Sequence, residues 1–176
     1  MKIAWWMVVL VASLGLTSIA RADDATGPEA FYGRYQGTGV TQDPNATFYG
    51  FESRDLDVEI GAEEGGFFVA WTTVIRPLTS KDIERKSTRV SFEPSGRPGI
   101  YIERSAAAHR EDGLSWASIS GKTLSVRLLT ILDDGSYEVQ SYERSMNKDG
   151  LFLFFRSDRD GAVIRIVTAG LHKRTQ

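Results

Sequence analysis

Short runs in which apolar and polar residues alternate recur along most of the chain. In the clearest run Leu56, Val58 and Ile60 fall on one side, with an acidic residue before each of them. A period of two residues predicts a β-strand with one buried face. We predict strands of this kind at residues 31–40, 55–60, 67–75, 86–92, 99–103, 114–119, 123–132, 137–144, 151–156 and 162–168.

Asp-Gly pairs separate the last four of these runs, at Asp134-Gly135, Asp149-Gly150 and Asp160-Gly161. Glycine accepts the positive φ that tight hairpins require, so each pair predicts a hairpin turn. No sustained helical period and no repeat of fixed length occur after residue 22. The pattern therefore predicts an all-β domain built as an antiparallel meander.

A meander of eight to ten strands leaves two open edges unless the sheet closes on itself. We therefore expect an up-and-down β-barrel, whose interior holds either packed side chains or one small ligand. A β-sandwich is the main alternative.

The N-terminus has the organisation of a secretory signal. Lys2 precedes an apolar run from Ile3 to Leu16, and the small residues Ala20 and Ala22 flank a cleavage position. The alternative, a membrane anchor, would need about 20 apolar residues. We expect a signal peptide at residues 1–22, a single domain at residues 23–176, and a periplasmic or secreted mature protein.

The overall composition excludes several classes of site. The 176 residues include no cysteine, which rules out disulfides, Fe–S clusters and thiolate chemistry. The formal charge of −2 gives no positive surface of the kind that nucleic-acid binding requires. We expect no nucleic-acid partner, no membrane-spanning segment after signal cleavage, and no cofactor; the oligomeric state stays open.

The first predicted strand opens with the residues Phe-Tyr-Gly-Arg-Tyr-Gln-Gly, from Phe31 to Gly37. This segment resembles the Gly-x-Trp signature that opens the first strand of lipocalins and other calycin-type barrels. Gly33 and Tyr35 would stand at the glycine and aromatic positions, with tyrosine in place of tryptophan. The resemblance implies a calycin-like barrel with a cavity for a small apolar molecule.

Aromatic residues on strand positions are the candidate lining of such a cavity. Phe67, Val69, Trp71 and Thr73 should share one face, which combines apolar bodies with a hydroxyl and an indole N–H. The alternative is that these side chains simply fill a small barrel. The candidate ligand-binding residues are Tyr35, Phe67, Trp71, Trp116 and Tyr137.

Ionisable residues give no catalytic or metal site. His109 and His172 are far apart and lack spaced acidic partners, so we expect both on the surface. A haem-ligand role for His172, as in barrels similar to nitrobindin, is the sharper alternative. Arg127 and Arg165 should face solvent, opposite the apolar faces of their strands. The inverse arrangement, an outer-membrane barrel, needs strands of about 9–11 residues, longer than several here.

Three functions remain open. The preferred one is non-catalytic binding of an apolar or amphipathic small molecule, which predicts a cavity above roughly 300 Å³. The first alternative is an envelope protein-protein interaction or scaffold module, which predicts a packed interior and an exposed apolar patch. The second alternative, an enzyme with a calycin-type cavity, predicts a buried ionisable group with a perturbed pKa.

Overall fold

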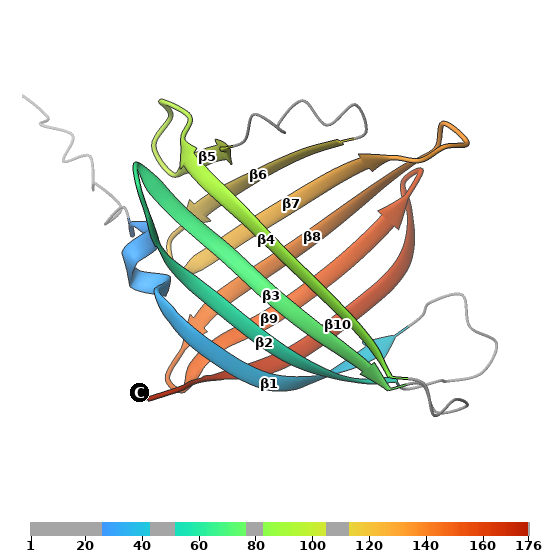
Figure 1. The fold of residues 1–176 in the computed structure, drawn as a ribbon, viewed down its shortest axis with the longest axis horizontal. Helices are drawn as coiled ribbons and strands as arrows, with labels where there is room; N and C mark the ends of the chain where they lie inside the picture. The colour runs from blue at the N-terminus through green and yellow to red at the C-terminus, as the bar shows by residue number, and fades with distance from the viewer. Residues whose placement is uncertain (1–25, 43–51, 77–82, 105–112, 176) are drawn as a thin grey trace, which may run out of the picture.

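The computed structural model describes residues 26–42, 52–76, 83–104 and 113–175, which form one antiparallel barrel (Figure 1). A short 3₁₀-helix precedes ten strands, which confirms the all-β prediction. The helix is η1 (Pro28–Phe31), and the strands are β1 (Gly33–Gln42), β2 (Glu52–Glu63), β3 (Gly66–Arg76), β4 (Glu84–Pro94), β5 (Ile100–Glu103), β6 (Gly113–Ser120), β7 (Thr123–Ile131), β8 (Tyr137–Asn147), β9 (Gly150–Arg159) and β10 (Ala162–Lys173).

Each strand pairs with its neighbours in the sequence, and β1 pairs with β10 to close the sheet. The closing pair runs from Tyr35 opposite Lys173 to Gln42 opposite Ile166. A closed meander excludes the β-sandwich and confirms the predicted up-and-down barrel.

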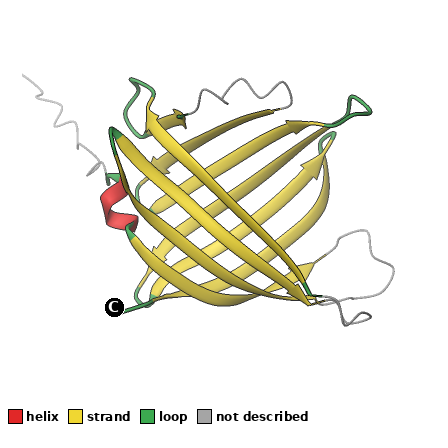
Figure 2. Cartoon of the chain, viewed as in Figure 1, coloured by secondary structure: helices red, strands yellow, loops and turns green. Residues whose placement is uncertain are grey.

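One half of the interior is densely filled with apolar side chains. Figure 2 shows the short helix η1 beside the start of β1, and Phe31 of this helix is fully buried in the hydrophobic core. The Tyr35 hydroxyl donates a hydrogen bond of 2.8 Å to the Phe31 carbonyl. We call this region the packed half; its buried members include Phe31, Tyr35, Ile60, Phe67, Phe92, Leu124, Leu151 and Leu171.

The predicted faces are correct for β2 and β4. Leu56, Val58 and Ile60 are all buried, and Val90 and Phe92 lie opposite the buried Val69 and Phe67 of β3. In these strands polar residues occupy the other face, so the sequence permits only one orientation.

The prediction for Arg165 is wrong, whereas Arg127 lies on the outer face as expected. Arg165 lies directly opposite Ser157, which is fully buried, so its side chain starts from the inner face. In β10 the buried residues Val167, Ala169 and Leu171 mark the inner face, and Arg165 lies on the same face two residues before Val167. The pairing of β10 with β9 also shifts register between Val163 and Arg165. Strand β10 is apolar on both faces near Arg165, and its sequence alone therefore leaves the orientation open.

Residues 1–25, which include the predicted signal, lie outside the described residues, as does His109. In the part of the chain that is described, no helix is long and apolar enough to cross a membrane.

Two glycines of β1 face the interior where β1 meets β10. Gly37 and Gly39 lie on the same face of β1 as the buried Tyr35 and Thr41. A Cβ atom at Gly37 would lie 2.0 Å from the carbonyl oxygen of Gly170, far closer than a carbon and an oxygen can approach. The close approach of the two strands therefore requires glycine at position 37.

We predict that Gly37→Ala destabilises the protein by about 1–3 kcal/mol, because the added methyl group must push two paired strands apart. The matched control is Gly170→Ala, where no atom lies within 4 Å of an added Cβ. That variant should change the free energy of unfolding by less than about 0.5 kcal/mol. Urea unfolding measures both; equal effects of the two substitutions would contradict the prediction.

Candidate functional site

A small cavity lies inside the barrel, beyond the packed half. Its volume is about 60 Å³, which is room for a few water molecules or one end of an organic molecule. The volume is far below the roughly 300 Å³ expected for an enclosed ligand. The lining comes from five strands and consists of Arg54, Leu56, Val58, Trp71, Thr73, Tyr142, Arg144, Leu153, Phe155 and Val167.

Three aromatic rings form a continuous wall of the cavity. The ring centroids of Trp71 and Tyr142 are 4.7 Å apart, and those of Tyr142 and Phe155 are also 4.7 Å apart. Both pairs are tilted by about 50°, within the range of favourable aromatic arrangements. This wall gives a guest molecule a rigid apolar surface, because side chains that pack against each other lose little further freedom on binding.

Arg144 is the most unusual residue of the lining. Its side chain is fully buried, and its guanidinium carbon lies 5.3 Å from the ring centroids of both Trp71 and Tyr142. Two of its nitrogens, Nε and Nη1, are buried without a hydrogen-bond partner among the described residues. A buried charge normally requires a partner, since its removal from water costs several kcal/mol.

Burial changes the pKa of both polar residues in this cluster. Burial raises the pKa of Tyr142 to about 12, against an opposing effect of the Arg144 charge. Burial lowers the pKa of Arg144 to about 10. At neutral pH the tyrosine therefore stays protonated and the arginine stays charged.

The other end of the interior is polar. Arg54 is 8% exposed, and its Nε donates a hydrogen bond of 2.6 Å to the Thr41 hydroxyl. Glu138 accepts hydrogen bonds from Ser157 at 2.6 Å and from Gln140 at 2.9 Å. We call this region the polar half; it contains Thr41, Arg54, Glu138, Gln140, Ser157 and Arg165.

The five predicted lining residues are not brought together. Trp71 alone borders the cavity, whereas Tyr35 and Phe67 belong to the packed half. The structure corrects the positions of the other two, because Trp116 and Tyr137 face outward. Trp116 lies opposite Ile102 of β5, which is 45% exposed, and Tyr137 is itself 40% exposed. Their strands carry apolar residues on both faces, so an aromatic side chain there does not identify the interior.

Sequence reasoning missed Arg144, Tyr142 and Arg54. A signal for Arg144 exists, since Tyr142, Arg144 and Met146 alternate with Glu143 and Ser145. This period of two places the arginine on the same face as an aromatic and a methionine side chain. The short run is mostly polar, however, and it does not by itself stand out as a strand with a buried face.

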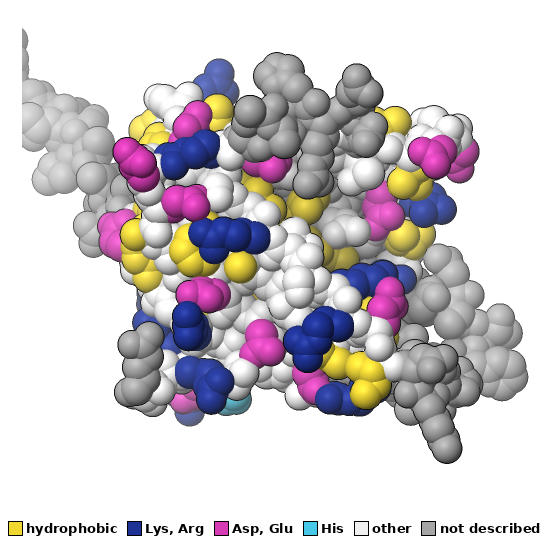
Figure 3. Space-filling view, viewed as in Figure 1, with side chains coloured by type: hydrophobic (Ala, Val, Ile, Leu, Met, Phe, Trp, Pro, Cys, Tyr) yellow, Lys and Arg dark blue, Asp and Glu magenta, His cyan; other side chains and the backbone are white. Residues whose placement is uncertain are grey.

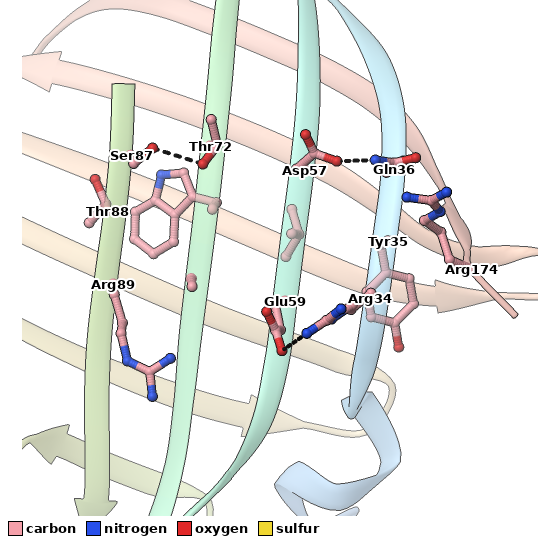
Figure 4. Close-up of a pocket in the computed structure, with 13 residues that line it drawn as sticks. Arg34, Tyr35, Gln36, Asp57, Glu59, Thr72, Ser87, Thr88, Arg89 and Arg174 are labelled. Atoms are coloured by element: carbon pink, nitrogen blue, oxygen red, sulfur yellow. Dashed lines mark hydrogen bonds and ion pairs between the residues drawn. The ribbon is translucent and has the colours of Figure 1, made fainter. Parts of the chain in front are cut away.

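A larger hollow of about 620 Å³ lies on the outer face of β1–β4 (Figure 4). Its polar side chains pair with one another: Arg34 with Glu59 at 3.2 Å, Gln36 with Asp57, and Thr72 with Ser87 at 2.8 Å. Figure 3 shows side chains of both charges interspersed over this side of the molecule. We interpret this outer hollow as solvated surface, because its groups are already satisfied and exposed ion pairs contribute little energy.

His172 is exposed and lies on β10 opposite Gln36 of β1 and Gly150 of β9. No group of three or more histidine, aspartate or glutamate residues able to hold a metal ion occurs among the described residues. Neither observation places His172 near the interior cavity.

No protein-family model and no curated protein matches the chain. Among solved structures it is similar to the S-type phycobiliprotein lyase CPES from Guillardia theta, with 7% identity over 85% of this chain and 91% of that chain, at a TM-score of 0.41. It also matches the 12:0-ACP thioesterase from Umbellularia californica, with 6% identity over 80% of this chain and 75% of that chain, at a TM-score of 0.18. Such low values say nothing about ligand or chemistry.

Glu138 should make the stability of the barrel depend on pH. Burial raises its pKa, but the hydrogen bonds from Ser157 and Gln140 and the charges of Arg159 and Arg165 outweigh this effect and lower the pKa. The contribution of ionised Glu138 to the free energy of unfolding is therefore complete above about pH 4.5, the ordinary pKa of a glutamate. It is lost as the pH falls through the lower pKa that Glu138 has in the folded protein. We predict that Glu138→Gln flattens the decline of Tm between about pH 5 and pH 3.

The matched control is Glu143→Gln, because Glu143 lies on the outer face of the same strand, with its carboxylate 3.8 Å from Arg127. Thermal unfolding followed by circular dichroism across this pH range compares the two variants. An unchanged slope in Glu138→Gln would show that the polar half does not contribute in this way.

Proposed function

We propose that the protein is an exported small β-barrel that binds an apolar or amphipathic small molecule in its interior cavity. One observation carries the proposal: five apolar side chains and the Trp71 ring surround a cavity that also contains the unpaired donors of Arg144. Small-molecule sites combine apolar walls with a few polar groups that orient the guest in the same way.

The cavity volume limits what the guest is. At about 60 Å³ the space takes one end of an organic molecule, whose remainder extends beyond the cavity toward the polar half. Such a guest would be amphipathic, since it would contact apolar walls such as Leu153 and Val167 and the polar groups near Arg54.

The buried ionisable groups favour binding over catalysis. An enzyme in such a cavity would need a group that exchanges a proton near neutral pH. The shifts at Tyr142 and Arg144 leave pKa values of about 12 and about 10, so both groups keep one protonation state near pH 7. The other polar lining residues, Arg54 and Thr73, are also suited to recognition rather than to proton transfer.

Export rests on residues 1–22, whose charged start, apolar run and Ala20–Ala22 site form a secretory signal. We predict that the mature protein purified from the periplasm of an expressing bacterium begins at Asp23. Intact-mass spectrometry measures this directly, and Ala22→Arg is the matched variant that should block cleavage. A full-length mass for the unaltered protein would contradict export by this signal.

The interior cavity should be required for binding. We predict that Val167→Phe abolishes retention of a small molecule, because the larger ring occupies the cavity. Native mass spectrometry of the periplasmic protein compares the retained mass before and after denaturation. Thr168→Phe is the matched control, since the same ring is then placed on the opposite face of β10.

Circular dichroism establishes that both variants fold. Equal retention by the two variants would place the bound molecule outside the cavity. An unaltered protein that retains nothing and takes up neither hexan-1-ol nor hexanoate would contradict the proposed function.

A second candidate function, a protein-protein interaction module, is favoured by one observation. Apolar side chains are exposed on the outer face of neighbouring strands β5 to β8, a face that charged residues usually occupy in a solvated barrel. They are Ile102, Leu114, Ile131 and Tyr137, which are 40–52% exposed.

A further inference from the structure

The charge on Arg144 is not balanced by any protein group that the structure describes. Its Nε and Nη1 have no hydrogen-bond partner among the described residues, although the side chain is fully buried. Arginine keeps its proton under all ordinary conditions, and neutralisation therefore does not relieve the cost of burial. The barrel thus contains a permanent cation with unused donors beside an internal cavity.

The carboxylates of the same strand have other partners. Glu143 lies on the outer face near Arg127, and Glu138 is bound by Ser157 and Gln140 in the polar half. The cavity lining itself contains no aspartate or glutamate. A counter-charge for Arg144 must therefore come from outside these residues.

The neighbouring aromatic residues satisfy only part of the guanidinium. Trp71 and Tyr142 stabilise its charge through their rings, both at 5.3 Å. Neither residue accepts a hydrogen bond from Nε or Nη1, and the Tyr142 hydroxyl donates to Gln140 at 2.8 Å. Nε and Nη1 point to different sides of the guanidinium, so a planar acceptor reaches either of them only together with Nη2, in the fork of the arginine.

We infer that the cavity binds the carboxylate end of a small monocarboxylate, whose carboxylate forms paired hydrogen bonds with Arg144 and whose first carbon atoms lie against the apolar cavity wall. This inference rests on the proposed function and names the ligand class for the same site. A carboxylate is planar and matches two parallel arginine N–H donors.

The rest of the lining distinguishes this ligand from an inorganic anion. Leu56, Val58, Leu153, Phe155 and Val167 give most of the wall an apolar character. Phosphate would expose several charged oxygens to these apolar side chains, and besides Arg144 the lining offers such oxygens only the polar groups of Arg54, Thr73, Tyr142 and Trp71. A carboxylate with a short alkyl tail directs its charge to Arg144 and its carbon atoms to the apolar wall.

The test compares two probes of equal length, hexanoate and hexan-1-ol, by isothermal titration of the purified protein in a buffer free of other carboxylates. We expect hexanoate to bind at least about 10-fold more tightly than hexan-1-ol, because only the anion pairs with the buried cation. Sodium nitrate and sodium chloride serve as inorganic competitors and should displace hexanoate only weakly.

Arg144→Met removes the charge while keeping a long side chain. It should weaken hexanoate binding about 30-fold or more and leave the affinity for hexan-1-ol within about 3-fold. Without ligand it should raise Tm by at least about 2 °C, since an unpaired buried charge is lost. Arg144→Lys keeps the charge but lacks the planar fork, and it should weaken hexanoate binding about 10-fold. Arg127→Met on the outer face is the matched control and should change neither affinity.

The outcomes separate the inference from the proposed function. If both probes bind equally well to the unaltered protein and to Arg144→Met, the cavity binds small molecules but the carboxylate inference is wrong. If neither probe binds, both proposals are wrong. If Arg144→Met lowers the ligand-free Tm, or if nitrate or chloride competes as well as hexanoate, Arg144 has a structural or general counter-ion role, and the inference is overturned.

Discussion

The backbone pairing of β1 with β10 is the interaction on which the rest of the structure depends. The other strand pairs join neighbours in the sequence, whereas this pair joins the two ends of the meander. It removes both open edges of the sheet and encloses an interior that would otherwise face water. The close contact at Gly37 and Gly170 shows how tightly the two strands meet. The cavity exists only because this pair holds the first and last strands together.

The enclosed interior changes character along the barrel. Apolar side chains fill the packed half, with Phe31 and Phe67 fully buried, and polar side chains occupy the other half. Arg144 lies where the two meet, beside the aromatic wall of Trp71 and Tyr142. Such a boundary is consistent with the proposed binding of an amphipathic molecule, because both kinds of surface are within reach of one guest.

The sequence was sufficient to predict the barrel, and it was less informative about the interior. The strict alternation of apolar and polar residues in β2 allows only one orientation of that strand. The Asp-Gly pairs near the C-terminus each predict a tight hairpin between two consecutive strands. Trp116 and Tyr137 were assigned to the wrong face because β6–β8 carry apolar residues on both sides. Arg165 was misplaced for a related reason, since the register of β10 is set by pairing with β9 and β1. The register of paired strands is a property of the assembled sheet, and the alternation of apolar and polar residues within one strand does not determine it.

The seam between the first and last strands has a consequence for chain connectivity. Lys173 Nζ donates a hydrogen bond of 2.8 Å to the carbonyl of Tyr32, and the Arg174 amide donates one of 2.8 Å to the carbonyl of Arg34. The two ends of the described barrel are therefore neighbours in space. A short peptide joining them, with new termini opened at a tight hairpin such as Asp133–Gly135, would give a circular permutant with the same strand order around the barrel. The architecture is thus a ring of hairpins in which the natural starting point is one choice among several.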